Sequence, residues 1–255
     1  MIDSLKKHQF LLEELIKRDF KRKYKGAVLG MAWSVLNPLI MLLIMRLVFS
    51  HFFAADIPHY TIYLFCGTIV FTYFTEATNG GMLALISNVE IFMKVNVPKY
   101  LFLTSKNVQT FINFALTFGV FLLFCIFDGI TFTWRFILLL YPIAMLLLFN
   151  IGAGLILSAL YVFFRDMQYL WGLATQVLTY LSAIFYSIDS FPSRIQKLFY
   201  LNPVYPFIRY FRLVVIDGVV PAPELHILIA LFSTAAMLIG TYIYRKYDTE
   251  FLYYF

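Results

Sequence analysis

Residues 12–38 read LEELIKRDFKRKYKGAVLGMAWSVLNP and change from a charged helical pattern into an apolar run. Apolar side chains recur there at helical spacing and form one stripe: Leu12, Leu15, Ile16, Phe20 and Tyr24. The opposite face carries cations: Lys17, Arg18, Lys21, Arg22 and Lys25. We therefore predict an amphipathic helix at about residues 9–25 that lies in the plane of a membrane interface. Its basic face either holds the chain on anionic lipid or contacts a soluble partner.

The composition of the chain is that of an integral membrane protein. Of its 255 residues, 62% are hydrophobic and 13% are charged, whereas about a quarter of a soluble domain is charged. Several continuous apolar runs reach the roughly 20 residues that cross the hydrocarbon layer as a helix. A transmembrane β-barrel would show short alternating segments instead. The predicted fold class is an all-α membrane protein with one domain, residues 1–255.

Six transmembrane helices are predicted, and the distribution of cations orients them. The apolar runs lie at about residues 31–52, 61–80, 107–127, 136–164, 169–188 and 225–244. With both termini on one side, 14 Lys and Arg residues fall on that side and 5 on the other. The positive-inside rule then places both termini in the cytoplasm. Eight of the 20 cations lie between Lys6 and Lys25, which indicates membrane lipids or a partner protein and not nucleic acid.

The segment after the second span predicts a short cytoplasmic helix. Ser87 and Glu90 have capping-box spacing, so we expect a helix at about residues 88–97 that stops before Pro98. Ten residues that include Glu90 and Lys94 cannot cross a membrane. The helix is therefore either a simple elbow or a docking element for a soluble protein.

The segment between spans 5 and 6 predicts a lid or funnel on the outer face. A seventh span there would hold two Arg and Pro206 within 13 residues, so two short re-entrant helices at about 192–216, split at Asn202-Pro203, fit better. Aromatic residues are frequent around this outer end, and their flat faces and hydroxyl groups suit sugar rings. The candidates for a channel or gate are Arg46, Tyr63, Phe185, Tyr186, Phe199, Tyr200, Tyr205 and Phe207.

Motifs for chemistry are missing from the sequence. It has no GxxxxGK[ST] phosphate loop, HExxH, GxSxG or CxxC, so we predict no catalytic, metal or cofactor-binding residue in this chain. Arg46 and Glu76 are the clear ionisable residues within spans, where a charge is costly. Each makes an inter-helix or snorkelling contact, or lines a polar path. Residues 152–155, GAGL, predict close helix packing.

Four segments share their pattern with a known family. They are LGMAWSVLNP at 29–38, NVEIFMK followed by VP within 88–98, FFRD at 163–166, and FP with LNP within 191–203. Together they resemble the ABC-2 type permease subunits of bacterial polysaccharide exporters, which move O-antigen, capsule or teichoic acid. The resemblance covers essentially the whole chain. One departure is Lys23-Tyr24, where many relatives have Arg-Tyr; the charge remains but the planar guanidinium is lost.

The resemblance implies the membrane-spanning permease subunit of an ATP-driven exporter of a lipid-linked polysaccharide in the bacterial inner membrane. Two copies would enclose a channel and bind two copies of an ABC nucleotide-binding subunit, which would hold the ATP and Mg²⁺. Residues 88–97 would be the coupling helix that docks on that subunit, and residues 192–216 would be gate helices. The implied coupling residues are Lys17, Arg18, Arg22, Asn88, Glu90, Lys94 and Pro98.

Other functions stay open at this point. The substrate of such an exporter could be teichoic acid, or a small hydrophobic drug or lipid. A membrane enzyme acting on lipid-linked sugars would need paired carboxylates, but Asp56, Asp128, Asp189 and Asp217 fall on different predicted loops. A structural membrane scaffold would show no dependence on an ATPase.

Overall fold

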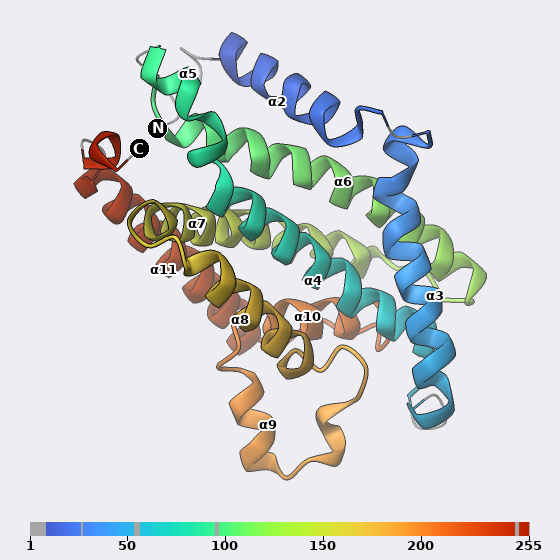
Figure 1. The fold of residues 1–255 in the computed structure, drawn as a ribbon. Helices are drawn as coiled ribbons and strands as arrows, with labels where there is room; N and C mark the ends of the chain where they lie inside the picture. Colours follow the sequence, from blue (N-terminus) through green and yellow to red (C-terminus); the bar gives the residue numbers. More distant parts are fainter. Residues whose placement is uncertain (1–8, 27, 54–56, 95–96, 248–249, 255) are drawn as a thin grey trace.

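The computed structural model describes residues 9–26, 28–53, 57–94, 97–247 and 250–254, and within these ranges the chain is helical, without strands. The long helices are α2 (Gln9–Tyr24), α3 (Trp33–Phe53), α4 (Tyr60–Leu83), α6 (Tyr100–Phe127), α7 (Leu140–Phe163), α8 (Met167–Leu181) and α11 (Pro223–Tyr247). The short ones are α5 (Val89–Lys94), α9 (Ser193–Phe199) and α10 (Tyr205–Val215). Figure 1 shows α5, the start of α2 and the end of α11 together at one end of the bundle, here called the α5 end. The opposite end, with α9, is called the α9 end.

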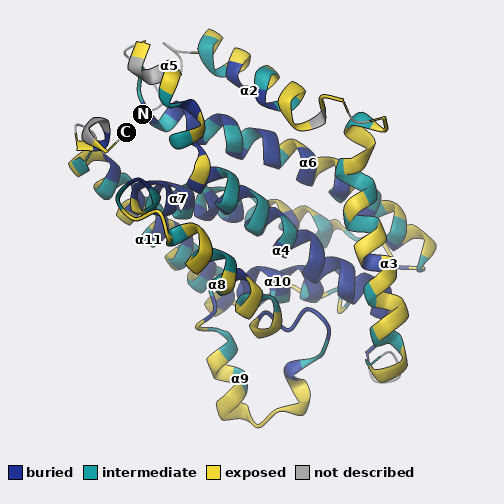
Figure 2. Cartoon of the chain, in the orientation of Figure 1, coloured by how far each residue is buried: buried dark blue, intermediate teal, exposed yellow. Residues whose placement is uncertain are grey.

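Helix α4 lies at the centre of the bundle. Of its 24 residues, 18 are buried, and it packs against α3, α6, α7 and α10. Figure 2 shows it mostly in the dark blue of buried residues. Its threonines donate back to the helix itself, for example Thr68 to the Leu64 carbonyl at 2.9 Å and Thr78 to the Phe74 carbonyl at 2.7 Å. Because neighbouring helices cover it, α4 can contain such polar residues without exposing them to lipid.

Among the described residues, four helical stretches are long and apolar enough to cross a membrane: Gly30–Phe53, Tyr100–Phe127, Trp134–Phe163 and Pro223–Tyr247. They correspond to the first, third, fourth and sixth predicted spans, the fourth of which ends at Phe163 and not at 164. Helix α4 is long enough but more polar, and α8 has 15 residues, fewer than the roughly 20 that a perpendicular span needs. The total of six spans therefore stays a prediction.

The fifth predicted span, 169–188, is too long. Helix α8 ends at Leu181, and Ala183 follows with φ at 48°, a conformation that is uncommon outside glycine. The buried Asn202 fixes this end: its Nδ2 donates to the Leu181 carbonyl at 3.1 Å and to Ser182 Oγ at 2.9 Å. Its Oδ1 accepts from the Val204 amide at 3.0 Å. One amide side chain therefore ends α8 and supports the start of α10.

Other boundaries differ less from the prediction. The two short helices expected within 192–216 are present as α9 and α10. Helix α6 begins at Tyr100 and not at 107, so it extends well beyond the apolar run. Helix α7 follows a 3₁₀ turn, Trp134–Leu139. Pro142 lies in the first turn of α7, where its missing amide removes no helical hydrogen bond.

Glycines bring α4, α7 and α11 into close contact. A Cβ atom added to Gly152 of α7 would lie 2.4 Å from the backbone of α11, and one added to Gly240 of α11 would lie 2.6 Å from the Gly152 carbonyl oxygen. A Cβ on Gly81 of α4 would lie 2.9 Å from Gly154 Cα. The close packing predicted from residues 152–155 is confirmed, since only small residues let helix backbones approach this closely.

The substitution Gly152→Ala tests this packing. The added methyl group would overlap the backbone of α11, which cannot move aside as a flexible side chain could, so α7 and α11 must separate. We expect the free energy of unfolding to fall by about 3 kcal/mol. Thermal unfolding of the detergent-purified protein measures it. Gly119→Ala on α6 is the control, because a Cβ there meets nothing within 4 Å. Equal stability of the two variants would contradict the observed packing.

Candidate functional site

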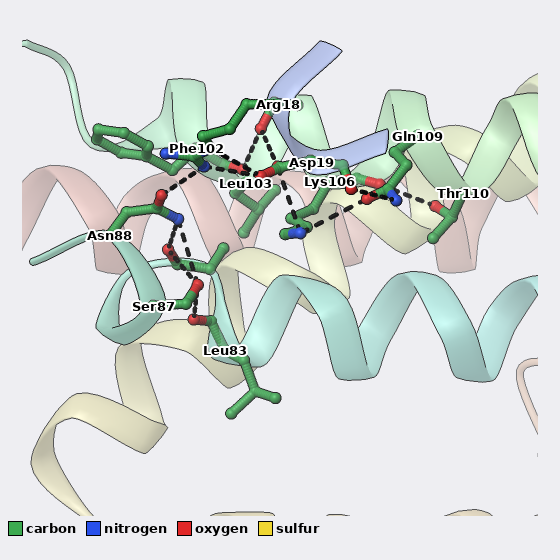
Figure 3. Close-up of polar contacts among 12 residues, drawn as sticks. Arg18, Asp19, Leu83, Ser87, Asn88, Phe102, Leu103, Lys106, Gln109 and Thr110 are labelled. Carbon is green, nitrogen blue, oxygen red and sulfur yellow. Dashed lines mark hydrogen bonds and ion pairs between the residues drawn. The ribbon is translucent and has the colours of Figure 1, made fainter. Parts of the chain in front are cut away.

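A buried ion-pair network surrounds Asp19 of α2 at the α5 end (Figure 3). Asp19 is 1% exposed. Its Oδ1 accepts from Arg18 Nη2 at 2.7 Å, and its Oδ2 accepts from Ser105 Oγ at 3.1 Å. Lys106 Nζ lies 3.3 Å from Oδ2, and Gln109 Nε2 donates to the Asp19 carbonyl oxygen at 3.1 Å. A buried carboxylate requires such partners, and here two cations and a hydroxyl group supply them.

The Asp19 contacts fix α2 against the first turns of α6. Leu15, one turn before Asp19, is also buried and packs with Phe102 and Leu103 of α6. Polar and apolar contacts therefore lie along the same side of α2. The amphipathic helix predicted at 9–25 is present, and it is attached to the bundle by this side.

Arg18 extends the network to the segment that precedes α5. Its Nη2 also donates to Asn88 Oδ1 at 2.6 Å, and Asn88 Nδ2 donates to the Ala84 carbonyl oxygen at 2.7 Å. Asn88 is 2% exposed and is the last residue of the 3₁₀ turn Ile86–Asn88, directly before α5. Two adjacent residues of α2, Arg18 and Asp19, therefore join the start of α6 to the segment that leads into α5. We call Arg18, Asp19, Asn88, Ser105, Lys106 and Gln109 the Asp19 network.

Helix α5 itself presents charge at the surface. Glu90 and Lys94 are both exposed. The helix covers Val89–Lys94, shorter than the predicted 88–97, and residues 95–96 lie outside the described ranges. Pro98 follows, and its carbonyl oxygen accepts from the Leu101 amide at 3.1 Å in the turn into α6.

The predicted capping box at Ser87 is not formed. Ser87 Oγ donates backward to the Leu83 carbonyl oxygen at 2.8 Å, so it does not cap α5. The 3₁₀ turn between α4 and α5 brings Ser87 close to the end of α4, and that contact replaces the cap.

The cations of α2 divide between the surface and an open cavity. Lys17 is exposed and pairs with Glu14 at 2.8 Å. Arg22 and Lys23 line a cavity of about 540 Å³ between α2, α4 and α6. There, Lys23 Nζ lies 3.0 Å from Glu76 Oε2. Glu76 therefore makes an inter-helix contact and also lines this polar cavity, so both interpretations of it stay open.

Arg46 has a different environment. It lies on the exposed side of α3 with apolar neighbours such as Leu43 and Leu47. Within the described part of the chain it makes no ion pair. A charge in the middle of an apolar helix face is costly in lipid, so this face suggests contact with water or with another protein surface.

The aromatic candidates all lie at the α9 end, and most of them pack against one another. Tyr63, Phe185, Tyr205 and Phe207 are buried. Phe185 stacks on Phe49 with 4.7 Å between ring centroids. Their role in a channel stays a prediction; in the single chain, the partly exposed candidates are Tyr186, Phe199 and Tyr200.

The carboxylates are less scattered than the sequence suggests. Asp189 and Asp217, from different loops, line one cavity at the α9 end. Asp128 instead pairs with His59, and Asp56 lies outside the described residues. No group of three His, Cys, Asp or Glu side chains in the described ranges could hold a metal.

Asp19 is the central residue of this network, and the sequence analysis missed it together with its partners on α6, Ser105, Lys106 and Gln109. It follows Leu15 by four positions and Ile16 by three, so it falls on the apolar stripe of the helix. A carboxylate on the apolar stripe indicates a buried ion pair. The partners could not be named from sequence, because Ser105 is 86 residues away.

The substitution Asp19→Asn should release α2 from α6. It leaves the partly buried Lys106 without its carboxylate, and breaking a buried pair costs about 3 kcal/mol. We expect faster hydrogen exchange of the α2 amides in the purified protein. The control is Glu14→Gln on the exposed side of the same helix, where the ion pair with Lys17 is screened by solvent and contributes little to stability. If the two variants exchange alike, the network does not hold α2.

The sequence was compared with known proteins. The family model "ABC-2 type transporter" matches residues 11–216. The chain is 27% identical to the O-antigen export system permease protein RfbA of Klebsiella pneumoniae, over 94% of this chain and 93% of that protein. It is also 27% identical to RfbA of Myxococcus xanthus, over 98% and 97% of the two chains. It is 22% identical to the polysialic acid transport protein KpsM of Escherichia coli, over 94% and 95%. The family match covers most of the chain and agrees with its apolar helices, so the chain is a multi-pass membrane protein of the ABC-2 type transporter family.

Proposed function

We propose that this chain is the membrane-spanning permease subunit of an ATP-driven exporter of a lipid-linked polysaccharide. The observation that carries the proposal is the end-to-end similarity to permeases named for O-antigen export. A third relative is named for the transport of polysialic acid, which is also a polysaccharide. Teichoic acid, or a small hydrophobic drug or lipid, is the alternative cargo.

The energy for transport comes from a separate subunit in this proposal. The sequence contains no phosphate-binding loop, so ATP and Mg²⁺ are bound by an ABC nucleotide-binding subunit. Helix α5 is the docking element, with Glu90 and Lys94 at its surface. When ATP draws two such subunits together, the displacement of α5 passes through Asn88 and Arg18 to α2 and α6.

Two copies of the chain form the channel in this proposal. Helices α3 and α8 expose long faces in the single chain, seen as yellow and teal stretches in Figure 2. The face of α8 contains polar Gln168 and Gln176 beside Leu173 and Val177, a mixture that is unsuited to lipid alone. A second copy would cover these faces, and Arg46 on α3 would face the channel or the partner.

The orientation follows from the positions of the cations. The α5 end, with the basic helix α2, is cytoplasmic, and the α9 end is the outer face of the bacterial inner membrane. Helices α9 and α10 are then gate helices at the exit.

Charge reversal on α5 tests the docking surface. If the partner surface is complementary to α5, Glu90→Lys and Lys94→Glu each bring two like charges together. We therefore expect the affinity for the ATPase subunit to fall about tenfold, which corresponds to a loss of about 1.4 kcal/mol in binding free energy, and less of that subunit to co-purify. Export, measured as polysaccharide on the surface of the host, should fall with it. Membrane insertion should not change, since neither side chain is buried.

The matched control is Lys197→Glu on α9, an exposed charge reversal at the opposite end. It should leave co-purification unchanged. Normal co-purification of both α5 variants would mean that the ATPase docks elsewhere. ATPase stimulation by hydrophobic drugs, with no response to glycolipid, would favour the alternative cargo.

A further inference from the structure

A small polar cavity lies at the α9 end, away from the Asp19 network. It has a volume of about 90 Å³, room for roughly six water-sized positions at about 15 Å³ each. Its wall is formed by the start of α4, one side of α10 and the loops after α8 and α10. The polar lining residues are Tyr63, Ser187, Asp189, Arg209, Arg212 and Asp217.

Arg212 is a buried cation without a carboxylate partner. It is 2% exposed, and its guanidinium carbon lies 3.4 Å from the centre of the Tyr63 ring. Its Nη2 donates to the Ile184 carbonyl oxygen at 3.1 Å. Its Nε has no hydrogen-bond partner, and no carboxylate of the described residues lies within ion-pair distance. Arginines are almost never this buried unless they are paired, and here the carbonyl oxygens of Tyr63 and Ile184 and the Tyr63 ring take the place of a carboxylate.

The other charged groups of the cavity are also held apart. Arg209, one turn before Arg212 on α10, forms no ion pair with a described residue. Asp189 Oδ2 accepts from Ser187 Oγ at 2.6 Å, and the Asp217 amide donates to the Arg212 carbonyl oxygen at 3.2 Å. The pKa of the Asp217 carboxyl group is raised, because the effect of burial is larger than the opposing effect of the Arg209 charge. Two guanidinium groups and two carboxylates therefore surround one space without neutralising each other in direct pairs.

This arrangement selects for a particular class of ligand. Guanidinium groups only donate hydrogen bonds, and ionised carboxylates only accept them. An inorganic anion would meet two carboxylates, and a metal cation would meet two guanidinium groups. A neutral molecule whose hydroxyl groups both donate and accept can satisfy Arg209 and both carboxylates. Sugar hydroxyl groups have this property, and the volume suits one edge of a sugar ring better than a lipid chain.

We propose that this cavity binds the hydroxyl-bearing edge of one neutral sugar ring at the outer mouth of the protein. Asp189 and Asp217 accept hydrogen bonds from the hydroxyl groups, and Arg209 donates to them. Arg212 is the positioning residue that holds Tyr63 and the loop after α8 in place. The identity of the sugar rests on the proposed function, because it would belong to the exported polymer as this leaves the channel.

The test uses the full-length chain, purified with any subunits that stay bound and placed in lipid nanodiscs. The probe is the oligosaccharide released by mild acid from the surface polysaccharide of the host. Saturation-transfer NMR measures its binding to the wild type and to Asp217→Asn and Arg209→Gln, which change side chains at the cavity rim. We expect binding to the wild type and about tenfold weaker binding to each variant, because a charge-assisted hydrogen bond is replaced by a weaker neutral one.

Glu224→Gln is the matched control, an exposed acid at the start of α11, and it should bind like the wild type. Wild-type affinity in both cavity variants would overturn the proposal, as would absence of binding to the wild type or displacement of the probe by inorganic phosphate. Deletion of the chain in the host distinguishes failure of the sugar-site proposal from failure of the proposed export function. Loss of surface polysaccharide on deletion, with normal binding in the cavity variants, refutes the sugar site alone; retained surface polysaccharide refutes the proposed function.

Discussion

Burial of the Asp19 carboxylate is the constraint on which the α5 end of the molecule depends. A charge at 1% exposure is stable only with partners, and here these are the adjacent Arg18 and two residues of α6, which is distant in sequence. Ser105 and Lys106 belong to α6, while Arg18 reaches Asn88 beside α5. The contacts of Asp19, together with the bond from Arg18 to Asn88, therefore hold the amphipathic helix, the start of α6 and the segment before α5 to one another. Under the proposed function, a force on α5 would therefore be passed to α2 and α6.

Helix α4 connects this end to the opposite one. Its first turn contains Tyr63, whose ring contacts Arg212, and it ends just before the turn that contains Asn88. Along its length it is packed closely, and at Gly81 its backbone touches α7. Closely packed helices transmit displacement with little compression. In this account α4 is the element through which movement of the docking segment reaches the cavity and the gate helices.

The sequence predicted the elements better than their contacts. Apolar runs, the cations of the first helix and the break at Asn202-Pro203 were sufficient for the all-helical class and for two short helices near 192–216. Helix α8 was predicted too long, because an apolar run does not reveal that Asn202 ends the helix. Asp19 and Arg212 were missed as site residues for a related reason. The spacing of Asp19 on the apolar stripe indicates its burial, but the partners of both residues lie far along the chain and are not visible in local spacing.

Recovery of the native complex tests the central claim most directly. The chain would be isolated in mild detergent from its own host and weighed intact by native mass spectrometry. The account predicts two copies of this chain with two copies of a soluble subunit that contains a phosphate-binding loop, and ATP hydrolysis that responds to the host's own glycolipid. Recovery of the chain alone, under conditions that keep other membrane complexes from the same cells intact, would contradict it.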